Sequence, residues 1–167
     1  MVTTNDLLLE LEREAQTTRR VLERVPDNQL NWRPHEKART LGELAMHVAI
    51  VPGAVASLIG SASPAQVPKV TDPILKSASE LLPTLDQSIA TAKKIVGGMD
   101  DAAFNAIWRM VQGDRELFAL TRAALLRSIM LNHWYHHRGQ LSVYLKELDV
   151  PIPSIYGPSA DENPFAI

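Results

Sequence analysis

The sequence predicts an all-α protein: an antiparallel four-helix bundle with a proline-rich C-terminal tail, in a single domain over residues 1–167. Apolar residues recur at steps of three and four positions over four long segments, which is the period of amphipathic helices. Proline, glycine and serine gather between these segments, where loops are expected. A chain of 167 residues, 46% of them hydrophobic, can bury one sizeable core, so no second domain is required.

The first predicted helix runs from Thr4 to Val25, where Pro26 ends it because proline cannot continue an α-helix. Its apolar positions form one stripe, which we expect to face the core. The expected inward positions are Leu8, Leu11, Ala15, Thr18, Leu22 and Val25.

The second predicted helix follows a turn-rich connection and begins in "TLGE", a capping box. In this motif the Thr40 hydroxyl accepts from the Glu43 amide, while the Glu43 carboxylate reaches back to the Thr40 amide. The helix continues to about Leu58, and Pro52 with the glycine after it is expected to bend it. The bend falls just past His47, which lies among apolar residues on the inward stripe.

The third predicted helix begins between Ser77 and Ser79, after the loop "GSASPAQVPKVTDP", and ends at Gly97. Its expected inward positions are Leu82, Leu85, Ile89, Ala92 and Val96. The stretch "IWRMVQGDRELFAL", before the fourth helix, has two interpretations. It forms a short hairpin that turns at Gly113 and Asp114, or it is irregular. The sequence leaves this choice open.

The fourth predicted helix runs from Thr121 to Leu148 and carries three of the five histidines. Its expected inward positions are Leu126, Met130, His133, His137, Leu141, Tyr144 and Leu148. After it, "DVPIPSIYGPSADENPFAI" contains four prolines in nineteen residues and cannot form a helix. Its apolar residues Ile152, Ile155 and Tyr156 predict that this tail packs along the bundle.

Composition and charge exclude several classes of function. The chain contains no cysteine, so it forms no thiolate metal site, and any thiol chemistry requires a small-molecule thiol. The formal net charge is −2 and no run of lysine or arginine is present, so nucleic acid is not an expected partner. The N-terminal sequence lacks the pattern of a signal peptide, and we expect no apolar stretch long enough to span a bilayer. We therefore expect a cytoplasmic protein with no membrane partner.

Three histidines at inward positions predict a metal site. Burying an imidazole without a polar partner costs on the order of 1–3 kcal/mol, so His47, His133 and His137 require a common explanation. Residues four apart on a helix have Cβ atoms about 5–6 Å apart on one face, so His133 and His137 can converge on one ion. His47 would be the third ligand, from the second helix. Three imidazoles leave open positions on a divalent ion, as in catalytic sites.

Alternatives to a catalytic ion stay open at this point. One is a metal-free polar network, and another is a non-catalytic module in which a metal or the histidines fix the core or a dimer interface. Three imidazoles suit zinc, nickel, copper or iron, and zinc or nickel is preferred here. A ferritin-like di-iron site is disfavoured, because it needs Glu-x-x-His motifs, whereas Met130 and Leu44 stand three positions before His133 and His47. No catalytic residue can be named from the sequence.

Five other polar residues each have two interpretations. His136 supports the metal ligands, or it is simply exposed. Arg138 anchors an anionic substrate or a partner chain, or it forms an ion pair at the surface. Glu43 orients a histidine or acts as a base, or it serves only in the capping box. Asp161 and Glu162 reach the mouth of the site, or they are ordinary solvated charges.

Two stretches carry a family resemblance: "NWRPHEKARTLGELAMHVA" and "NHWYHHRGQLSVYLKELDVPIPSIYGPSADE". They resemble the DinB/YfiT-like superfamily of bacterial metal-binding four-helix bundles, which is unrelated to the DNA polymerase that shares the DinB name. Members of this superfamily bind a divalent metal through one histidine on the second helix and an HxxxH pair. By that motif, the resemblance implies that the ligands are His47, His133 and His137.

The resemblance also implies a function. Characterised relatives include thiol-dependent S-transferases and a mycothiol-dependent isomerase. We therefore expect a metal-dependent enzyme, a transferase or a hydrolase, that acts on a small-molecule substrate with a low-molecular-weight thiol as cosubstrate. The same resemblance, together with apolar residues beyond the needs of one core, favours a homodimer.

Overall fold

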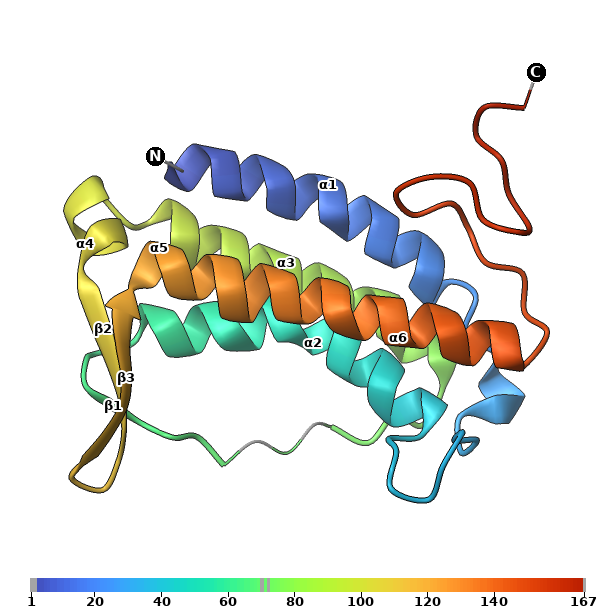
Figure 1. The fold of residues 1–167 in the computed structure, drawn as a ribbon, viewed down its shortest axis with the longest axis horizontal. Helices are drawn as coiled ribbons and strands as arrows, with labels where there is room; N and C mark the ends of the chain where they lie inside the picture. Colours follow the sequence, from blue (N-terminus) through green and yellow to red (C-terminus); the bar gives the residue numbers. More distant parts are fainter. Residues whose placement is uncertain (1–2, 70, 72, 167) are drawn as a thin grey trace.

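The computed structural model of the protein describes residues 3–69, 71 and 73–166. Residues 1, 2 and 167 of the predicted domain, and residues 70 and 72 of the predicted loop, lie outside the described residues. The helices are α1 (Thr4–Leu22), α2 (Leu41–Gly60), α3 (Leu81–Gly97), α4 (Asp101–Asn105), α5 (Arg122–Leu125) and α6 (His133–Glu147). A π-helical segment, Leu126–Asn132, joins α5 to α6, and the three together form one continuous last helix (Figure 1). Short 3-10 turns cover Asp27–Gln29 and Ala78–Glu80.

The protein is mostly helical, but the all-α prediction is wrong because a small three-stranded sheet is present. Strands β2 (Ile107–Gln112) and β3 (Arg115–Thr121) form an antiparallel hairpin, and the short β1 (Ala65–Gln66) pairs with β2 in parallel. The hairpin turns at Gly113 and Asp114, where Gly113 has a φ of +61° that favours glycine. The hairpin interpretation of this stretch is therefore confirmed. Strand β1 has no signal in the sequence, because two residues cannot show an alternating pattern.

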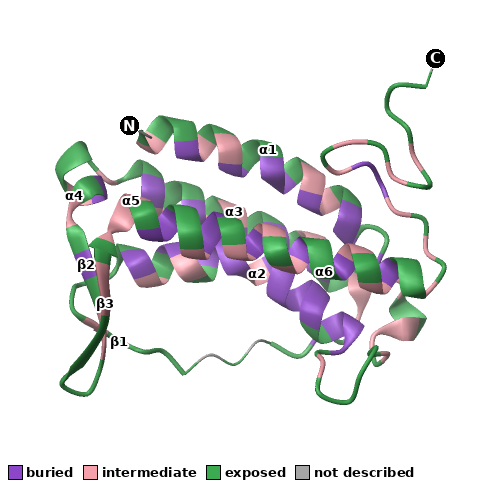
Figure 2. Cartoon of the chain, viewed as in Figure 1, coloured by how far each residue is buried: buried purple, intermediate pink, exposed green. Residues whose placement is uncertain are grey.

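Helix α2 lies at the centre of the structure. It packs against α3 and against the last helix, while α1 packs mainly against α3. Figure 2 shows α2 buried over most of its length, whereas the other long helices expose one face. Contrary to the expectation from the sequence, α2 has the length and the mean hydropathy, 1.6, of a membrane span. However, 67% of the 18-residue stretch that has this hydropathy is buried inside the protein, as in a core helix.

The inward stripes of α1 and α3 largely follow the predictions. The buried residues of α1 are Leu7, Leu11, Glu14, Ala15, Thr18, Val21 and Leu22. Those of α3 are Leu81, Leu85, Ser88, Ala92 and Val96. Leu8 and Leu82 are only half-buried, because the residue before each takes the innermost position. Three buried positions, Glu14, Thr18 and Ser88, are polar, and each has a partner in a neighbouring helix.

The π-helical segment determines which residues of the last helix face the core. Its hydrogen bonds join residues five apart, so each turn holds more residues than an α-helical turn. The residues after it are therefore rotated relative to a regular α-helix. Trp134 and Arg138 are 0% and 1% exposed, while His133 and His137 are half-buried. The predicted inward stripe is thus only partly right here, since the two histidines lie at the edge of the core.

The interpretation of Arg138 as a surface ion pair is wrong, because its side chain is buried. Its Nη2 atom lies 2.6 Å from Glu14 Oε2, and its Nη1 atom donates to Thr18 Oγ1 at 3.1 Å. The guanidinium carbon lies 5.2 Å and 5.1 Å from the ring centres of Tyr135 and Tyr156. Tyr156 also donates to Glu14 Oε2 at 2.9 Å. This buried pair ties α6 to α1 and to the C-terminal tail.

The C-terminal tail packs beside the ends of α1 and α6 (Figure 1), as its apolar residues predict. Its partly buried apolar residues include Val150, Ile152 and Ile155, whereas Tyr156, which is also expected to pack, is 70% exposed. Lys146 Nζ lies 3.0 Å from Asp161 Oδ1, and Arg20 Nη2 lies 2.6 Å from Glu162 Oε1. A hydrogen bond from the Ile152 amide and the Lys146 ammonium lower the pKa of Asp161, and Arg20 lowers the pKa of Glu162. The two carboxylates therefore hold the tail to the helices.

Breaking the buried ion pair should destabilise the protein far more than breaking an exposed one. We expect Arg138→Ala to lower the free energy of unfolding by about 3–5 kcal/mol, because Glu14 then keeps a buried charge without its partner. Lys93→Ala is the matched control, since it breaks a half-exposed pair with Glu12 and should cost below about 1 kcal/mol. Urea denaturation measures both changes. Equal losses in the two variants would contradict the role assigned to the buried pair.

Candidate metal centre

Helix α2 positions the first of the three histidines. The helix begins in the predicted capping box: Glu43 N donates to Thr40 Oγ1 at 3.1 Å, and Thr40 N donates to Glu43 Oε2 at 2.7 Å. The capping role of Glu43 is therefore confirmed, and its side chain is exposed. These bonds define the first turn, so His47 follows one turn after Glu43 and is 7% exposed.

The structure brings the three predicted histidines together. His133 and His137 lie one turn apart on α6, and the Nε2 atoms of His47 and His133 are 3.2 Å apart. The ring centre of His137 lies 4.5 Å from that of His47 and 4.3 Å from that of His133. One ring nitrogen from each residue lies within 4.8 Å of the others. Among the described residues, this is the group of histidine and acidic side chains that could hold a metal ion.

The spacing of the ring nitrogens fits a divalent ion. Two imidazole nitrogens bound at about 2.0–2.1 Å to a tetrahedral zinc lie about 3.3 Å apart. The separation of the His47 and His133 Nε2 atoms, 3.2 Å, is close to this value. Imidazole nitrogen also suits nickel, copper and iron, so the donor set alone does not select one metal.

Gln140 orients His137. The His137 Nδ1 atom lies 2.7 Å from Gln140 Oε1, which can only accept a hydrogen bond. Nδ1 therefore carries the proton, and Nε2 keeps its lone pair for a metal. Burial lowers the pKa of His137, and the nearby charges of two other histidines and Arg39 lower it further, against a smaller raising effect of the Gln140 bond. The neutral imidazole, which is the form that binds metals, is therefore favoured.

His136 does not join the group of three. Its side chain is exposed, and its ring centre lies 5.0 Å from that of His137. The group contains the two histidines of α6 that are four residues apart, as the helical spacing predicts. Asp161 and Glu162 are also outside the group, because their partners are Lys146 and Arg20.

A hydrogen bond between α6 and α2 holds the two helix backbones together beside the histidines. Pro52 has no backbone N–H, so the Val48 carbonyl, four residues earlier, lacks its usual donor within α2. The indole Nε1 of Trp134 donates to this carbonyl at 2.8 Å. Trp134 directly follows His133, and Val48 directly follows His47. The bond therefore keeps the two histidine-bearing backbones at one separation.

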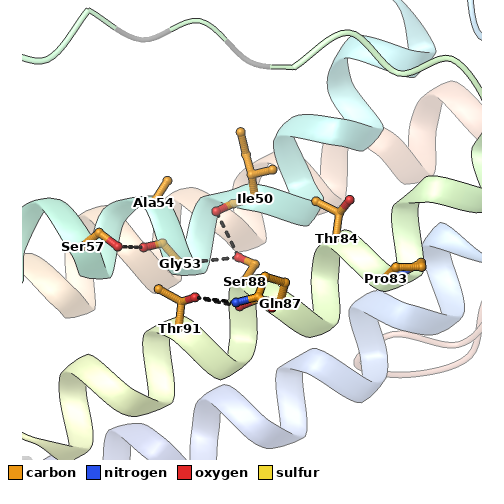
Figure 3. Close-up of a pocket in the computed structure, with 9 residues that line it drawn as sticks. All are labelled: Ile50, Gly53, Ala54, Ser57, Pro83, Thr84, Gln87, Ser88 and Thr91. Carbon is orange, nitrogen blue, oxygen red and sulfur yellow. Dashed lines mark hydrogen bonds between the residues drawn. The ribbon is translucent and has the colours of Figure 1, made fainter.

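On another face, α2 is held by α3 near the same proline (Figure 3). Gly53 N donates to Ser88 Oγ at 2.8 Å, and Ser88 Oγ donates to the Ile50 carbonyl at 3.0 Å. A Cβ at Gly53 would lie 2.8 Å from the Ser88 carbonyl oxygen, so only glycine allows this approach. A cavity of about 460 Å³ borders these residues, but the described residues that line it include no charged side chain and no histidine. We assign this region a structural role.

Another cavity, of about 400 Å³, lies beside the histidine group. His47 and His133 form part of its wall. The rest of the described lining comes from apolar residues of α2, from Ile129 of the π-helical segment, and from Pro68, Lys69 and Thr71 after β1. The volume is that of a small-molecule site, so the histidines are accessible to a ligand. The sequence does not indicate this cavity, because the segment after β1 meets α2 only through the fold.

Comparisons with known proteins agree with this description. The model of the DinB family matches residues 1–164. The uncharacterized protein YrdA of Bacillus subtilis (strain 168) is 26% identical over 170 residues, covering 96% of this chain and 92% of YrdA. A solved DinB-like protein from Bacillus cereus ATCC 10987 has a TM-score of 0.69 at 20% identity, covering 91% of this chain and 97% of that one. For the DinB-like protein YjoA of Bacillus subtilis, the TM-score is 0.66 at 19% identity, covering 89% of this chain and 96% of that one.

The fold and the site define a mostly helical protein with three clustered histidines that are close enough to hold a metal ion. The match of the family model over nearly the whole chain goes one step further: the chain belongs to the DinB family. The likeness to solved structures, at 19–20% identity, bears on the fold alone. The family resemblance expected from the two sequence stretches is thereby confirmed.

Metal content should depend on three histidines and not on the fourth. We expect His47→Ala, His133→Ala and His137→Ala each to lose bound zinc or nickel, because each variant removes one nitrogen from the group. His136→Ala is the matched control, since it removes an exposed imidazole beside the group and should keep about one ion per chain. Elemental analysis of the purified variants measures this. Loss in His136→Ala with retention in His137→Ala would contradict the assignment.

Trp134→Phe should weaken metal binding without removing a ligand. The variant keeps an aromatic ring but loses the donor to the Val48 carbonyl, so the two helix backbones can separate. We expect metal affinity to fall about tenfold, at the lower end of the loss seen when partners of metal ligands are removed. Trp108→Phe is the matched control, because its buried Nε1 has no hydrogen-bond partner in the part of the chain that the structure describes. Competition with a chromophoric chelator gives both affinities, and equal values would argue against positioning by Trp134.

Proposed function

We propose that this chain is a metal-dependent enzyme in which His47, His133 and His137 hold one divalent ion, zinc or nickel. The observation that carries the proposal is that two of these histidines line a cavity of about 400 Å³. A structural zinc site is closed by four protein ligands, whereas three histidines leave a position for a substrate, a water or a thiol. An open position beside a cavity favours a catalytic ion over a purely structural one.

The residues of this chain supply the surroundings for metal chemistry. A divalent ion, when bound, polarises a carbonyl or lowers the pKa of a water or thiol. Gln140 holds the proton of His137 at Nδ1, and Trp134 keeps α2 beside α6. The apolar part of the cavity wall limits access of water. Because the chain contains no cysteine, a reacting thiol would come from a low-molecular-weight cosubstrate. These features support a thiol-dependent transferase or a hydrolase that acts on a small molecule.

We also propose that the four long helical segments form an antiparallel four-helix bundle and that the chain acts as a cytoplasmic homodimer. Exposed apolar side chains support the homodimer: Ile107 and Leu120 of the hairpin and Val143 of α6 are 52%, 46% and 59% exposed. The burial of α2 supports the absence of a membrane partner, and the net charge of −2 supports the absence of a nucleic-acid partner.

Turnover should require both the ion and the intact group of histidines. Protein stripped with a chelator is reloaded with zinc or nickel and incubated with thiol-reactive electrophiles or esters, with and without a small thiol. We expect turnover only after reloading. It should persist in His136→Ala and fall in His137→Ala by more than the roughly 10- to 100-fold typical of outer-shell changes.

The alternative, a non-catalytic metal-binding module, gives a different result in the same experiment. Reloading would then raise the melting temperature, since a ligand that binds only the folded state stabilises it. No substrate would be consumed with either metal, whether or not a thiol is present. That result would contradict the enzymatic proposal and leave the metal site intact.

A further inference from the structure

The cavity beside the histidines has a shape that favours an elongated ligand. Its volume of about 400 Å³ lies within the range of about 300–1,000 Å³ that is usual for small-molecule sites. Along α2 its lining extends from His47 to Leu58, which at about 1.5 Å per residue corresponds to about 16 Å. A cavity of this length and volume is narrow. A chain-like molecule therefore fills it better than a compact one.

The wall along this length is mainly apolar. Ile50, Val55 and Leu58 of α2, and Ile129 of the π-helical segment, all line the cavity and are only partly buried. Their apolar surface thus remains open to a ligand although it belongs to the most buried helix of the protein. Placing an apolar body against it removes that surface from water, which is favourable. The body of the ligand is therefore expected to be apolar.

The charge of the lining selects the polar group of the ligand. Lys69, an exposed residue of the segment after β1, is the lysine of the lining, and no aspartate or glutamate is among the described residues that line the cavity. Within residues 3–69, 71 and 73–166, no hydrogen bond or ion pair engages the Lys69 ammonium group. An ammonium group at the edge of an apolar cavity attracts an anion and repels a cation.

We infer that this cavity binds an elongated monocarboxylate, with its apolar body along α2 and its carboxylate paired with Lys69. The inference rests on the proposed function in one respect only, because it takes the end of the cavity beside the histidines as the place where the ligand reacts. Binding of the carboxylate itself depends on the wall and on Lys69. Neither the three histidines nor membership of the DinB family indicates a substrate class. The inference names one.

Calorimetric titration of the metal-loaded protein with three probes of one chain length tests the preference. The probes are octanoate, octanol and octylamine, which carry a negative charge, no charge and a positive charge. We expect octanoate to bind with a Kd below about 1 mM and octylamine to bind about tenfold or more weakly. Octanol should lie between them. Absence of octanoate binding in this range, or equal binding of all three probes, would overturn the inference.

Two variants locate the binding. Lys69→Glu should weaken octanoate binding about tenfold or more while leaving metal content unchanged, because it places a like charge beside the carboxylate. Lys94→Glu is the matched control, since it makes the same change of net charge at an exposed position of α3 outside this cavity and should leave Kd unchanged. Val55→Trp should abolish octanoate binding by filling the cavity, again with metal retained. Equal effects of the two lysine variants would overturn the assignment of Lys69.

The same measurements separate this inference from the proposed function. Octanoate binding that depends on Lys69, in a protein that turns over no substrate, supports the inference and contradicts the enzymatic proposal. Metal-dependent turnover that is indifferent to Lys69→Glu and Val55→Trp, with no octanoate binding, supports the enzyme and overturns the inference. In His133→Ala, which lacks one metal ligand, octanoate should still bind, because the apolar wall and Lys69 remain.

Discussion

Pro52 leaves the Val48 carbonyl without a hydrogen-bond donor inside α2. The position of the histidines depends on which other part of the protein supplies that donor. A helix buried over most of its length has no water for such a group, so the donor must come from the protein. Trp134 provides it from α6, while Ser88 of α3 accepts from the amide of Gly53, next to the proline. The irregular part of α2 is therefore held from two neighbouring helices. His47, one residue before Val48, is held with it.

The last helix separates its structural and functional residues by a single position. Trp134 and Arg138, one turn apart, are buried and fasten α6 to α2 and α1. His133 and His137, also one turn apart, directly precede them and lie at the edge of the core. At the edge, burial is sufficient to lower the pKa of His137 and favour its neutral form. The same position leaves the histidine pair beside a cavity that a ligand can enter.

Local patterns in the sequence were enough to predict much of the fold and the candidate site. The capping box at Thr40 and Glu43 and the helical periods depend on neighbouring residues, and the structure contains them. The spacing of His133 and His137 likewise follows from the helical repeat. The meeting of this pair with His47 could be expected because both segments are apolar enough to require burial against each other.

Features that depend on distant partners could not be predicted in the same way. The burial of Arg138 is decided by Glu14, 124 positions earlier in the chain, and a charged residue alone does not indicate such a partner. The π-helical segment has no pattern of its own, yet it turns Trp134 and Arg138 to the core. Pro52 carries more information in the sequence than the bend that it predicts. A proline inside a buried helix leaves the carbonyl four residues earlier without its donor, so another part of the protein must supply one.

Anomalous diffraction from crystals of the zinc-loaded protein, recorded on both sides of the zinc absorption edge, tests the central claim most directly. The structure predicts one anomalous peak per chain, at about 2.0–2.1 Å from a ring nitrogen of each of His47, His133 and His137. The remaining coordination should be completed by solvent on the side of the cavity. A peak elsewhere, or a peak whose ligands include fewer than these three histidines, would contradict the assignment of this group as the metal centre.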